Sequence, residues 1–223
     1  MKNKYLLLLF ALCPALLFPQ TKESLPSRLE AAGMVPLKDI DPSIRVDLCF
    51  SQANNVAGRA LYADLHDAYL HPQAAFALRK SQAALKRLRP DLTLLIYDAA
   101  RPISTQQQLH NLVKGKNTNI YINDPKFGGD QHNYGLAVDV TLCKENGDTL
   151  SMGTRHGALC ELSGQGHEET ALAEGKLTQE QVANRQLLRR VMAIGGFKPL
   201  RTQWWHFNFR TISEAKANFK KIP

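Results

Sequence analysis

The chain has 223 residues and a formal net charge of +8, with 44% hydrophobic and 22% charged residues. This size and composition are ordinary for a soluble globular protein with one compact domain, and two small domains fit less well. The positive charge is compatible with nucleic acid or an anionic envelope polymer as a partner. However, the aromatic cluster at 204–209 is only flanked by Arg201 and Arg210, and no basic run carries interleaved aromatics. We therefore expect no nucleic-acid binding.

The N-terminus has the layout of an export signal. Lys2 and Lys4 give a positive start, Tyr5–Phe18 is almost wholly apolar, and polar sequence begins at Gln20. A run of this length is short for a bilayer span and is typical of a secretory signal.

Residues 1–20 are therefore predicted to be a signal peptide and residues 21–223 a single domain, exported to the periplasm or cell envelope. An uncleaved membrane anchor is the alternative reading of the same run. Cys13 is compatible with a lipoprotein, but Leu12 before it is a poor residue for that cleavage. No later segment is long and apolar enough to predict a stable membrane span.

Three cysteines follow the predicted signal: Cys49, Cys143 and Cys160. An odd number cannot pair completely within one chain. A disulfide between Cys143 and Cys160 is possible in an oxidising periplasm. Three small buried thiols are the slightly favoured alternative.

The first half of the chain shows a mixture of strand and helix patterns. Residues 44–50 alternate between apolar and polar positions, which predicts a half-buried strand. Residues 72–88 read as a helix, with a proline in the first turn and Pro90 beyond the far end. The apolar run 92–97 predicts a short strand, and residues 104–114 predict a helix.

The second half continues the mixture. Residues 136–142 alternate like a strand, residues 178–194 form the clearest helical pattern with a capping box at its start, and residues 204–209 resemble a final strand. Residues 144–175 have weak periodicity and are predicted to be a functional or mobile loop region. Because strands and helices do not alternate regularly, we expect an α+β fold with a mainly antiparallel sheet flanked by helices.

His132 and Asp139 are the first candidate metal ligands, and they lie seven residues apart. On a helix they would be separated by about 10.5 Å along the axis, which is too far for ligands roughly 2 Å from a shared zinc ion. The chain must therefore fold back between them, and Gly135 is suited to that turn. Asp139 would then face a cleft from the 136–142 strand. A solvated aspartate opposite an apolar stripe is the ordinary alternative.

His206 and Arg101 supply the other candidate groups. Two histidines and one carboxylate are a common ligand set for catalytic zinc, which polarises a carbonyl and lowers the pKa of water. A lone histidine among aromatics is more often a core residue. Arg101 follows the 92–97 strand and can stabilise oxyanion charge, or simply pair with Asp98.

Strand alternation also predicts which side chains share the face of His206. Trp204 should lie on that face, while Trp205, Phe207 and Phe209 should face the core. Gln203 and His206 are three residues apart, so on a straight strand their side chains would point to opposite faces. Gln203 can approach a metal only if the chain bends at the start of the strand.

Taken together and in this order, the motifs resemble the D-alanyl-D-alanine dipeptidases, zinc peptidases related to the D,D-carboxypeptidases that share a fold with the hedgehog signalling domain. The resemblance runs from about Val35 to Phe209. It is carried by Ile44–Leu48, Asn54–Asn55, Gly58–Arg59, Asp98, Arg101–Pro102, His132, Gly135, Ala137, Asp139, Met152–Thr154, Leu177–Thr178, Asn184–Arg185, Leu187–Leu188 and Trp204–His206. It implies one zinc ion per chain, with His132, Asp139 and His206 as ligands, and Arg101 steadying the transition state.

Three positions depart from the family pattern. Gln203 stands where the family has the glutamate that acts as general base, and an amide cannot accept a proton near neutral pH. Loss of a positioned base typically removes about 10²–10⁴-fold of rate. Gly157 stands where the family has the aspartate that holds the substrate's amino end, and Asp130 replaces a serine. Metal binding is therefore predicted to be intact, whereas proton transfer and substrate anchoring are altered.

The resemblance predicts a zinc-dependent hydrolase acting on D-Ala-D-Ala or a related peptidoglycan fragment, with activity weakened at Gln203. The alternative is a zinc-binding pseudoenzyme that binds wall peptides without cleaving them. A carboxylate replacing Gln203 would favour the enzyme. Asp130, Glu161 and Glu168 are the candidates, and only Asp130 is close to a predicted ligand in sequence.

Overall fold

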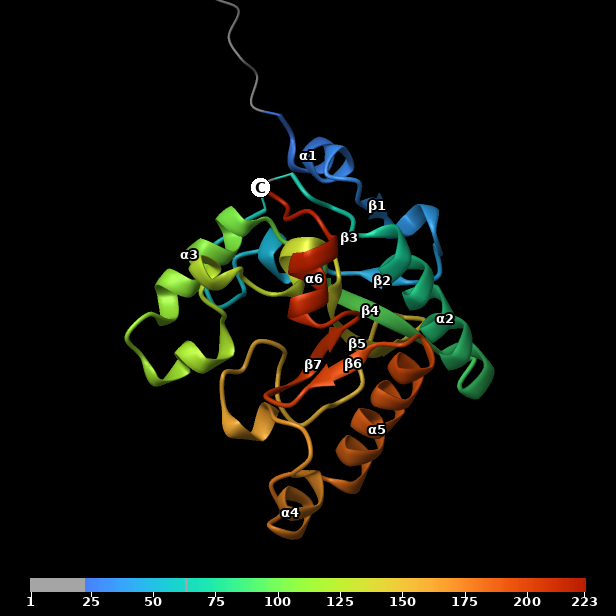
Figure 1. The fold of residues 1–223 in the computed structure, drawn as a ribbon. Coiled ribbons are helices and arrows are strands. Elements are labelled where there is room, and N and C mark those ends of the chain that lie inside the picture. The colour runs from blue at the N-terminus through green and yellow to red at the C-terminus, as the bar shows by residue number, and fades with distance from the viewer. Residues whose placement is uncertain (1–22, 63) are drawn as a thin grey trace, which may run out of the picture.

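The computed structural model describes residues 23–62 and 64–223 (Figure 1). The predicted signal peptide and Cys13 lie outside the described residues. In the part of the chain that is described, no helix is long and apolar enough to cross a membrane.

A five-stranded sheet with the order β2-β4-β5-β7-β6 forms the centre of the molecule. Its strands are β2 (Arg45–Val46), β4 (Leu92–Asp98), β5 (Ala137–Lys144), β6 (Lys198–Leu200) and β7 (Gln203–Asn208). Only β2 and β4 run parallel, and the other neighbours are antiparallel. A separate pair joins β1 (Val35–Pro36) to β3 (Tyr69–Leu70). The mainly antiparallel α+β fold is therefore confirmed.

Six α-helices surround the sheet in the described residues: α1 (Leu25–Ala31), α2 (Pro72–Leu88), α3 (Ile103–Val113), α4 (Glu168–Ala173), α5 (Gln179–Ile194) and α6 (Ile212–Asn218). The long helices α2 and α5 pack against each other and against β4 and β5. In Figure 1 they lie on the right, whereas α3 lies on the left. The long helices therefore cover one face of the sheet.

The side chains of strand β5 are buried on both faces of the sheet. Leu136, Val138 and Val140, which were predicted to face the core, are fully buried. Ala137 and Thr141, on the predicted cleft face, are buried as well. A functional group on this face therefore lies below the molecular surface, with little contact with bulk water.

Most predicted elements are confirmed to within two residues, because each carries its own periodic pattern. The helix predicted at 178–194 is α5, and Thr178 and Gln181 form the capping box. The strand predicted at 44–50 is the main exception. Only Arg45 and Val46 pair with β4, and the chain then turns into a 3₁₀ helix at Cys49–Ser51.

The alternating burial of that segment is real even though the pairing is short. Ile44, Leu48 and Phe50 are all buried. The segment lies at the edge of the sheet, where packing against the core satisfies the pattern without a continuous ladder of hydrogen bonds. The alternating pattern therefore predicted the buried side chains correctly, but it overestimated the length of the strand.

The segment predicted to be a loop, 144–175, is largely irregular but contains α4. It is held by Arg185 of α5, whose guanidinium donates to the carbonyls of Met152, Leu162 and Gly164 at 2.7, 2.9 and 3.1 Å. A buried arginine with three carbonyl acceptors fixes a segment that has little regular structure of its own.

The three described cysteines are free thiols, so the possible disulfide between Cys143 and Cys160 is not formed. Their burial differs from the expectation: Cys143 is buried, Cys49 is half-buried and Cys160 is exposed.

Candidate metal centre and active-site cavity

The three candidate ligands come from three adjacent pieces of backbone. His132 lies in the 3₁₀ segment Gln131–Tyr134, Asp139 on β5 and His206 on β7. Asp139 and His206 are register partners across the β5–β7 ladder, so their side chains are neighbours on one face of the sheet.

Gly135 makes the turn that returns His132 to Asp139. Its φ of 65° is in the left-handed region, where glycine is favoured. A Cβ there would lie 2.4 Å from Met34 Sδ and 2.7 Å from the backbone nitrogen of His71. The predicted fold-back is therefore present, and both geometry and close packing require glycine.

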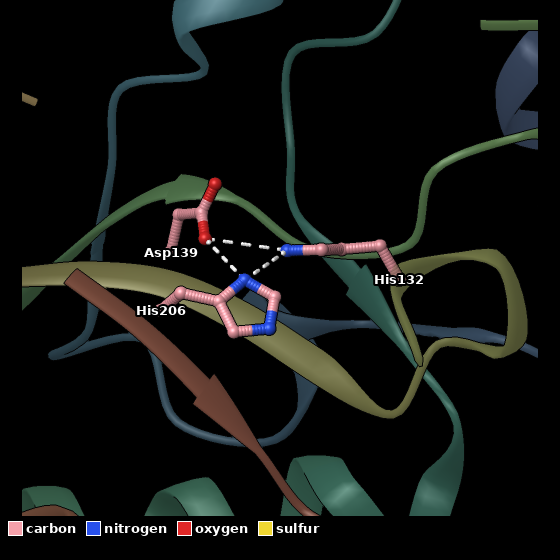
Figure 2. Close-up of side chains that lie close together, drawn as sticks. All are labelled: His132, Asp139 and His206. Carbon is pink, nitrogen blue, oxygen red and sulfur yellow. Dashed lines mark hydrogen bonds and ion pairs between the residues drawn. The ribbon is translucent and has the colours of Figure 1, made fainter. Parts of the chain in front are cut away.

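The candidate ligand atoms form a nearly equilateral triangle (Figure 2). Asp139 Oδ1 lies 3.2 Å from His132 Nε2 and 3.1 Å from His206 Nδ1, and the two nitrogens are 3.1 Å apart. Ligands about 2 Å from one tetrahedral zinc ion would be roughly 3.3 Å from each other. The triangle therefore has the dimensions of one face of a tetrahedral metal site.

The outer hydrogen bonds fix the tautomers of both histidines. His132 Nδ1 lies 2.6 Å from the carbonyl of Ala99, and His206 Nε2 lies 2.9 Å from Asn208 Oδ1. Carbonyl oxygens only accept hydrogen bonds, so those ring nitrogens carry the protons. The opposite nitrogens then direct lone pairs at Asp139 Oδ1. Three buried lone pairs aimed at one point repel one another unless a cation lies between them, so the donor set fits a metal ion.

The charge of the surroundings fits a divalent ion as well. The Arg101 guanidinium lies 2.6 Å from Asp98 Oδ2, 3.4 Å from Asp130 Oδ2 and 3.7 Å from Asp139 Oδ2. All four side chains are buried. One cation against three carboxylates leaves two negative charges that a divalent ion would neutralise.

Positive charge beside Asp139 favours its ionised form. Burial by itself would raise the pKa of Asp139, but the charge of a protonated His132 and hydrogen bonds from His132, His156 and His206 outweigh burial and hold that pKa well below its usual value. A cation bound between neutral histidines would favour the charged carboxylate in the same direction. Burial would lower the pKa of Arg101, but Asp98 and Asp130 raise it far above the ordinary range. Asp139 is therefore an ionised candidate ligand and Arg101 a permanent cation.

The candidate ligands open onto a cavity of about 390 Å³. Its wall includes every residue that the sequence singled out for the site, namely Arg101, Asp130, His132, Asp139, Gly157, Gln203 and His206. The volume is in the range of small-molecule sites. The chain thus brings a possible metal site, a buried cation and a substrate-sized space together.

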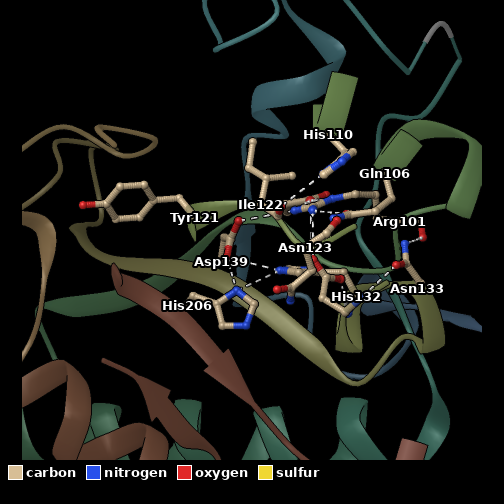
Figure 3. Close-up of polar contacts among 12 residues, drawn as sticks. Arg101, Gln106, His110, Tyr121, Ile122, Asn123, His132, Asn133, Asp139 and His206 are labelled. Atoms are coloured by element: carbon tan, nitrogen blue, oxygen red, sulfur yellow. Dashed lines mark hydrogen bonds and ion pairs between the residues drawn. The ribbon is translucent and has the colours of Figure 1, made fainter. Parts of the chain in front are cut away.

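Two amide side chains tie the segment 121–123 to this cavity. Gln106, labelled in Figure 3, accepts from Arg101 Nη1 at 2.8 Å and donates to the carbonyl of Asn123 at 2.9 Å. Gln203 Nε2 donates to the carbonyl of Tyr121 at 3.3 Å. Gln203 therefore acts here as a hydrogen-bond donor to backbone, a role that a carboxylate could not fill.

The face prediction for the two tryptophans is wrong. Trp205 lines the cavity beside Gln203, and its ring centroid lies 5.1 Å from that of His156. Trp204 lines a different hollow and donates through Nε1 to Thr154 Oγ1 at 2.9 Å. The register between β6 and β7 shifts next to Leu200, which changes the twist of β7 before it reaches His206. Residues of both parities consequently reach the cavity.

Of the three carboxylates considered as replacements for the missing base, Asp130 alone lines the cavity. Its Oδ1 accepts from the backbone N–H of His132 at 3.0 Å, and its Oδ2 faces Arg101. Glu161 lines a separate hollow beside α4, and Glu168 is paired with Arg189. Asp130 thus caps the 3₁₀ segment of His132 and helps to place Arg101.

His156 is a cavity residue close to Asp139 that the sequence did not single out. Its Nε2 lies 3.5 Å from Asp139 Oδ2, and its ring stacks on Tyr97 with centroids 4.5 Å apart. It comes from the irregular segment 152–164, which offers no periodicity to interpret. The one available signal was its position beside Gly157, after the Met152–Thr154 motif.

Comparison with known proteins gives a consistent result. A family model described as D-ala-D-ala dipeptidase matches residues 30–220. A D-alanyl-D-alanine dipeptidase of Escherichia coli (strain K12) is 33% identical over 178 residues, which cover 80% of this chain and 85% of that protein. A protein with the same name from Enterococcus faecalis is 26% identical over 191 residues, which cover 78% of this chain and 90% of that protein. Another from a Synechocystis strain is 26% identical over 163 residues, which cover 59% of this chain and 65% of that protein.

Proposed function

The chain belongs to the D-Ala-D-Ala dipeptidase family, whose members are peptidases. We propose that it is a zinc-dependent hydrolase of D-alanyl-D-alanine or related cell-wall peptides. His132, Asp139 and His206 would hold one zinc ion per chain. The observation that carries this proposal is the convergence of three buried lone pairs at the spacing of a tetrahedral site.

A bound zinc ion would supply Lewis-acid polarisation of the scissile carbonyl and a stronger water nucleophile at neutral pH. Arg101 would stabilise the negative charge that develops on the carbonyl oxygen. Its guanidinium is already oriented by Asp98 and Gln106, so no reorganisation is needed as the charge appears. A buried, preorganised cation is most effective where contact with bulk water is small.

Proton transfer is the weak step of the proposed reaction. Gln203 lines the cavity where a base is needed, but its amide can neither take a proton from water nor give one to the leaving amine. Asp130 is the carboxylate closest to this role among the three candidates, yet both of its oxygens already have partners. We expect hydrolysis to be slow relative to an enzyme with a positioned carboxylate base.

A second function is favoured by one specific observation. Gln203 holds the carbonyl of Tyr121, so its amide has a structural use that is independent of catalysis. A protein that binds wall peptides in the cavity without cleaving them would keep this contact and the metal. In either case the partner would be a D-amino-acid dipeptide or a peptidoglycan fragment.

The placement of such a partner agrees with the predicted N-terminus. Residues 1–20 would direct export to the periplasm or cell envelope, and residues 21–223 would form the zinc-binding domain. Asp130 and Gly157 would contribute to the substrate side of the cavity, through the placement of Arg101 and through open space respectively.

The direct test is zinc-loaded protein incubated with D-Ala-D-Ala, with release of free D-alanine as the readout. We expect slow, zinc-dependent turnover that a chelator abolishes and added zinc restores. His206→Ala is the matched control and should be inactive. No release from the natural protein, together with saturable peptide binding, would replace the hydrolase by the binding protein.

A further inference from the structure

A second hollow of about 290 Å³ lies next to the metal cavity. The two hollows share four lining residues: Phe50, Val56, His156 and Gly157. The second hollow continues along the segment 47–55 and past Tyr97 and Arg155. The space available to a ligand therefore does not end at the metal cavity.

Gly157 lies where the two hollows meet, and it leaves that junction open. Its φ is 75°, and a Cβ built on it would have no heavy atom within 4 Å. Gly153, four residues earlier, is different, because a Cβ there would lie 2.1 Å from Leu177. The space beside Gly157 is thus unfilled, whereas that at Gly153 is occupied by the packed core.

The junction of the two hollows offers no carboxylate to a positively charged amino group. The described wall of the metal cavity contains three carboxylates, Asp124, Asp130 and Asp139, and none of them also lines the second hollow. Asp130 faces Arg101, and Asp139 belongs to the metal triangle. An ammonium at the junction, beside Phe50 and Val56, would lose water without gaining a carboxylate partner, which is costly.

The second hollow does not compensate for this. Its described wall has one carboxylate, Asp47, and one guanidinium, Arg155, and both are exposed. Asp47 also accepts from the side-chain amide of Gln52. An ammonium therefore gains no net attraction there, whereas a neutral peptide group finds polar partners.

From the continuous space of the two hollows and the charges on their walls, we propose that the substrate is a peptide of at least three residues. The nitrogen of its penultimate residue would belong to a peptide bond and would not be a free ammonium. The residue preceding the terminal pair would pass Gly157 and occupy the second hollow. The inference rests on the proposed hydrolase function and names its substrate class.

The reaction would be hydrolysis of the last peptide bond. Water oxygen forms a bond to the carbonyl carbon, and the bond from that carbon to the amide nitrogen breaks. Both protons of the water end on the nitrogen of the released terminal D-alanine, which leaves as an ammonium, and the shortened peptide leaves with a new carboxylate. No oxidant or other co-reactant is required.

The test compares zinc-loaded protein with two substrates, free D-Ala-D-Ala and N-acetyl-L-Ala-D-Ala-D-Ala. We expect kcat/KM to be at least tenfold higher for the acetylated tripeptide. Gly157→Asp should shift the preference towards the free dipeptide by supplying a carboxylate at the junction. Gly157→Asn is the matched control, because it has the same shape and tolerance of positive φ without the charge.

Each outcome separates the inference from the function on which it rests. Equal or faster cleavage of the free dipeptide would overturn the inference and leave the hydrolase intact. If neither peptide is cleaved, the affinities of both peptides for the zinc-loaded protein are measured by calorimetric titration, and they decide whether the proposed substrate class holds. At least tenfold tighter binding of the tripeptide would support the substrate class although hydrolysis fails, and a smaller difference, or no binding of either peptide, would overturn it.

Discussion

The cavity has two sides that are built in different ways. On the sheet side, Asp139 and His206 sit opposite each other on paired strands, and His132 is fixed by one tight turn. On the other side, His156 and Gly157 lie on an irregular segment that Arg185 holds through its carbonyls. Paired strands leave little freedom for the side chains they carry, whereas an irregular segment can change residues without disturbing the sheet.

The predicted departures from the family pattern leave the candidate ligands unchanged. His132, Asp139 and His206 are the residues that the resemblance implies, whereas Asp130, Gly157 and Gln203 depart from it. Gln203 belongs to β7, but it lies at the start of the strand, where the register with β6 has shifted. The candidate ligand set is therefore kept, while Asp130 and Gln203 on the same segments and Gly157 on the irregular segment differ from the family pattern.

The largest expected effect tests the sheet side alone. His132→Ala and His206→Ala should each reduce bound zinc from about one equivalent per chain to almost none, because two remaining ligands hold the ion poorly. Elemental analysis of metal-loaded, dialysed protein measures this. His66→Ala, at an exposed position, is the control and should keep its zinc. Full zinc retention by both variants would remove the proposed ligand set.

Arg101→Lys tests the group that lies between the two sides. Lysine keeps the charge near Asp98 and Asp130 but loses the forked geometry of the guanidinium. We expect kcat to fall by about 10²-fold or more, with zinc content unchanged, since loss of one oriented oxyanion donor has that typical size. Parallel zinc and turnover measurements check it. An unchanged kcat would exclude Arg101 from stabilising the transition state.

Gln203→Glu tests the substrate side and should have a smaller, opposite effect. A carboxylate at this position supplies the missing proton acceptor, so turnover of a D-Ala-D-Ala peptide should rise roughly tenfold or more. Part of the gain is offset, because the carboxylate would repel the Tyr121 carbonyl that Gln203 now holds at 3.3 Å. Turnover should be measured at saturating and at low substrate.

Gln203→Met is the matched control for that experiment, because it removes the contact with Tyr121 without adding a proton acceptor. It should not exceed the natural rate. Fast hydrolysis by the natural protein would contradict the prediction and direct attention to Asp130 as the base.

The smallest effect concerns the outer end of the irregular segment, where Glu168 of α4 pairs with Arg189 of α5. Burial would raise the pKa of Glu168, but the hydrogen bond from Arg189 and the backbone bonds outweigh it, so the pKa is lowered. The unfolded chain then binds the proton more readily. The pair therefore stabilises the fold above the ordinary glutamate pKa of 4.5 and loses this contribution as the pH falls through the lowered value.

We expect Glu168→Gln to lower the free energy of unfolding by about 1 kcal/mol at pH 7, because Arg189 is partly exposed and solvent screens the pair. The difference from the natural protein should shrink well below pH 4.5. Urea denaturation at both pH values measures it. Glu169→Gln, at the exposed neighbouring position, should show little change at either pH. A pH-independent difference would mean that packing, and not charge, holds α4.

The sequence determined those features that are written in short stretches of the chain. Periodicity located α2 and α5, the capping box placed the start of α5, and the seven-residue spacing of His132 and Asp139 required the turn at Gly135. Each of these depends on neighbours within a few turns or on fixed backbone dimensions. The motif order likewise placed the chain in its family before any geometry was known.

Tertiary structure alone decided what depends on residues far apart in the chain. His156 reaches Asp139 only because Arg185 folds the intervening segment back, and Trp205 reaches the cavity only because the β6–β7 register shifts. The donor role of Gln203 depends on where the carbonyl of Tyr121 lies. Local propensity carries no information on such contacts, since they arise from packing and hydrogen bonding between segments that have no fixed spacing in sequence.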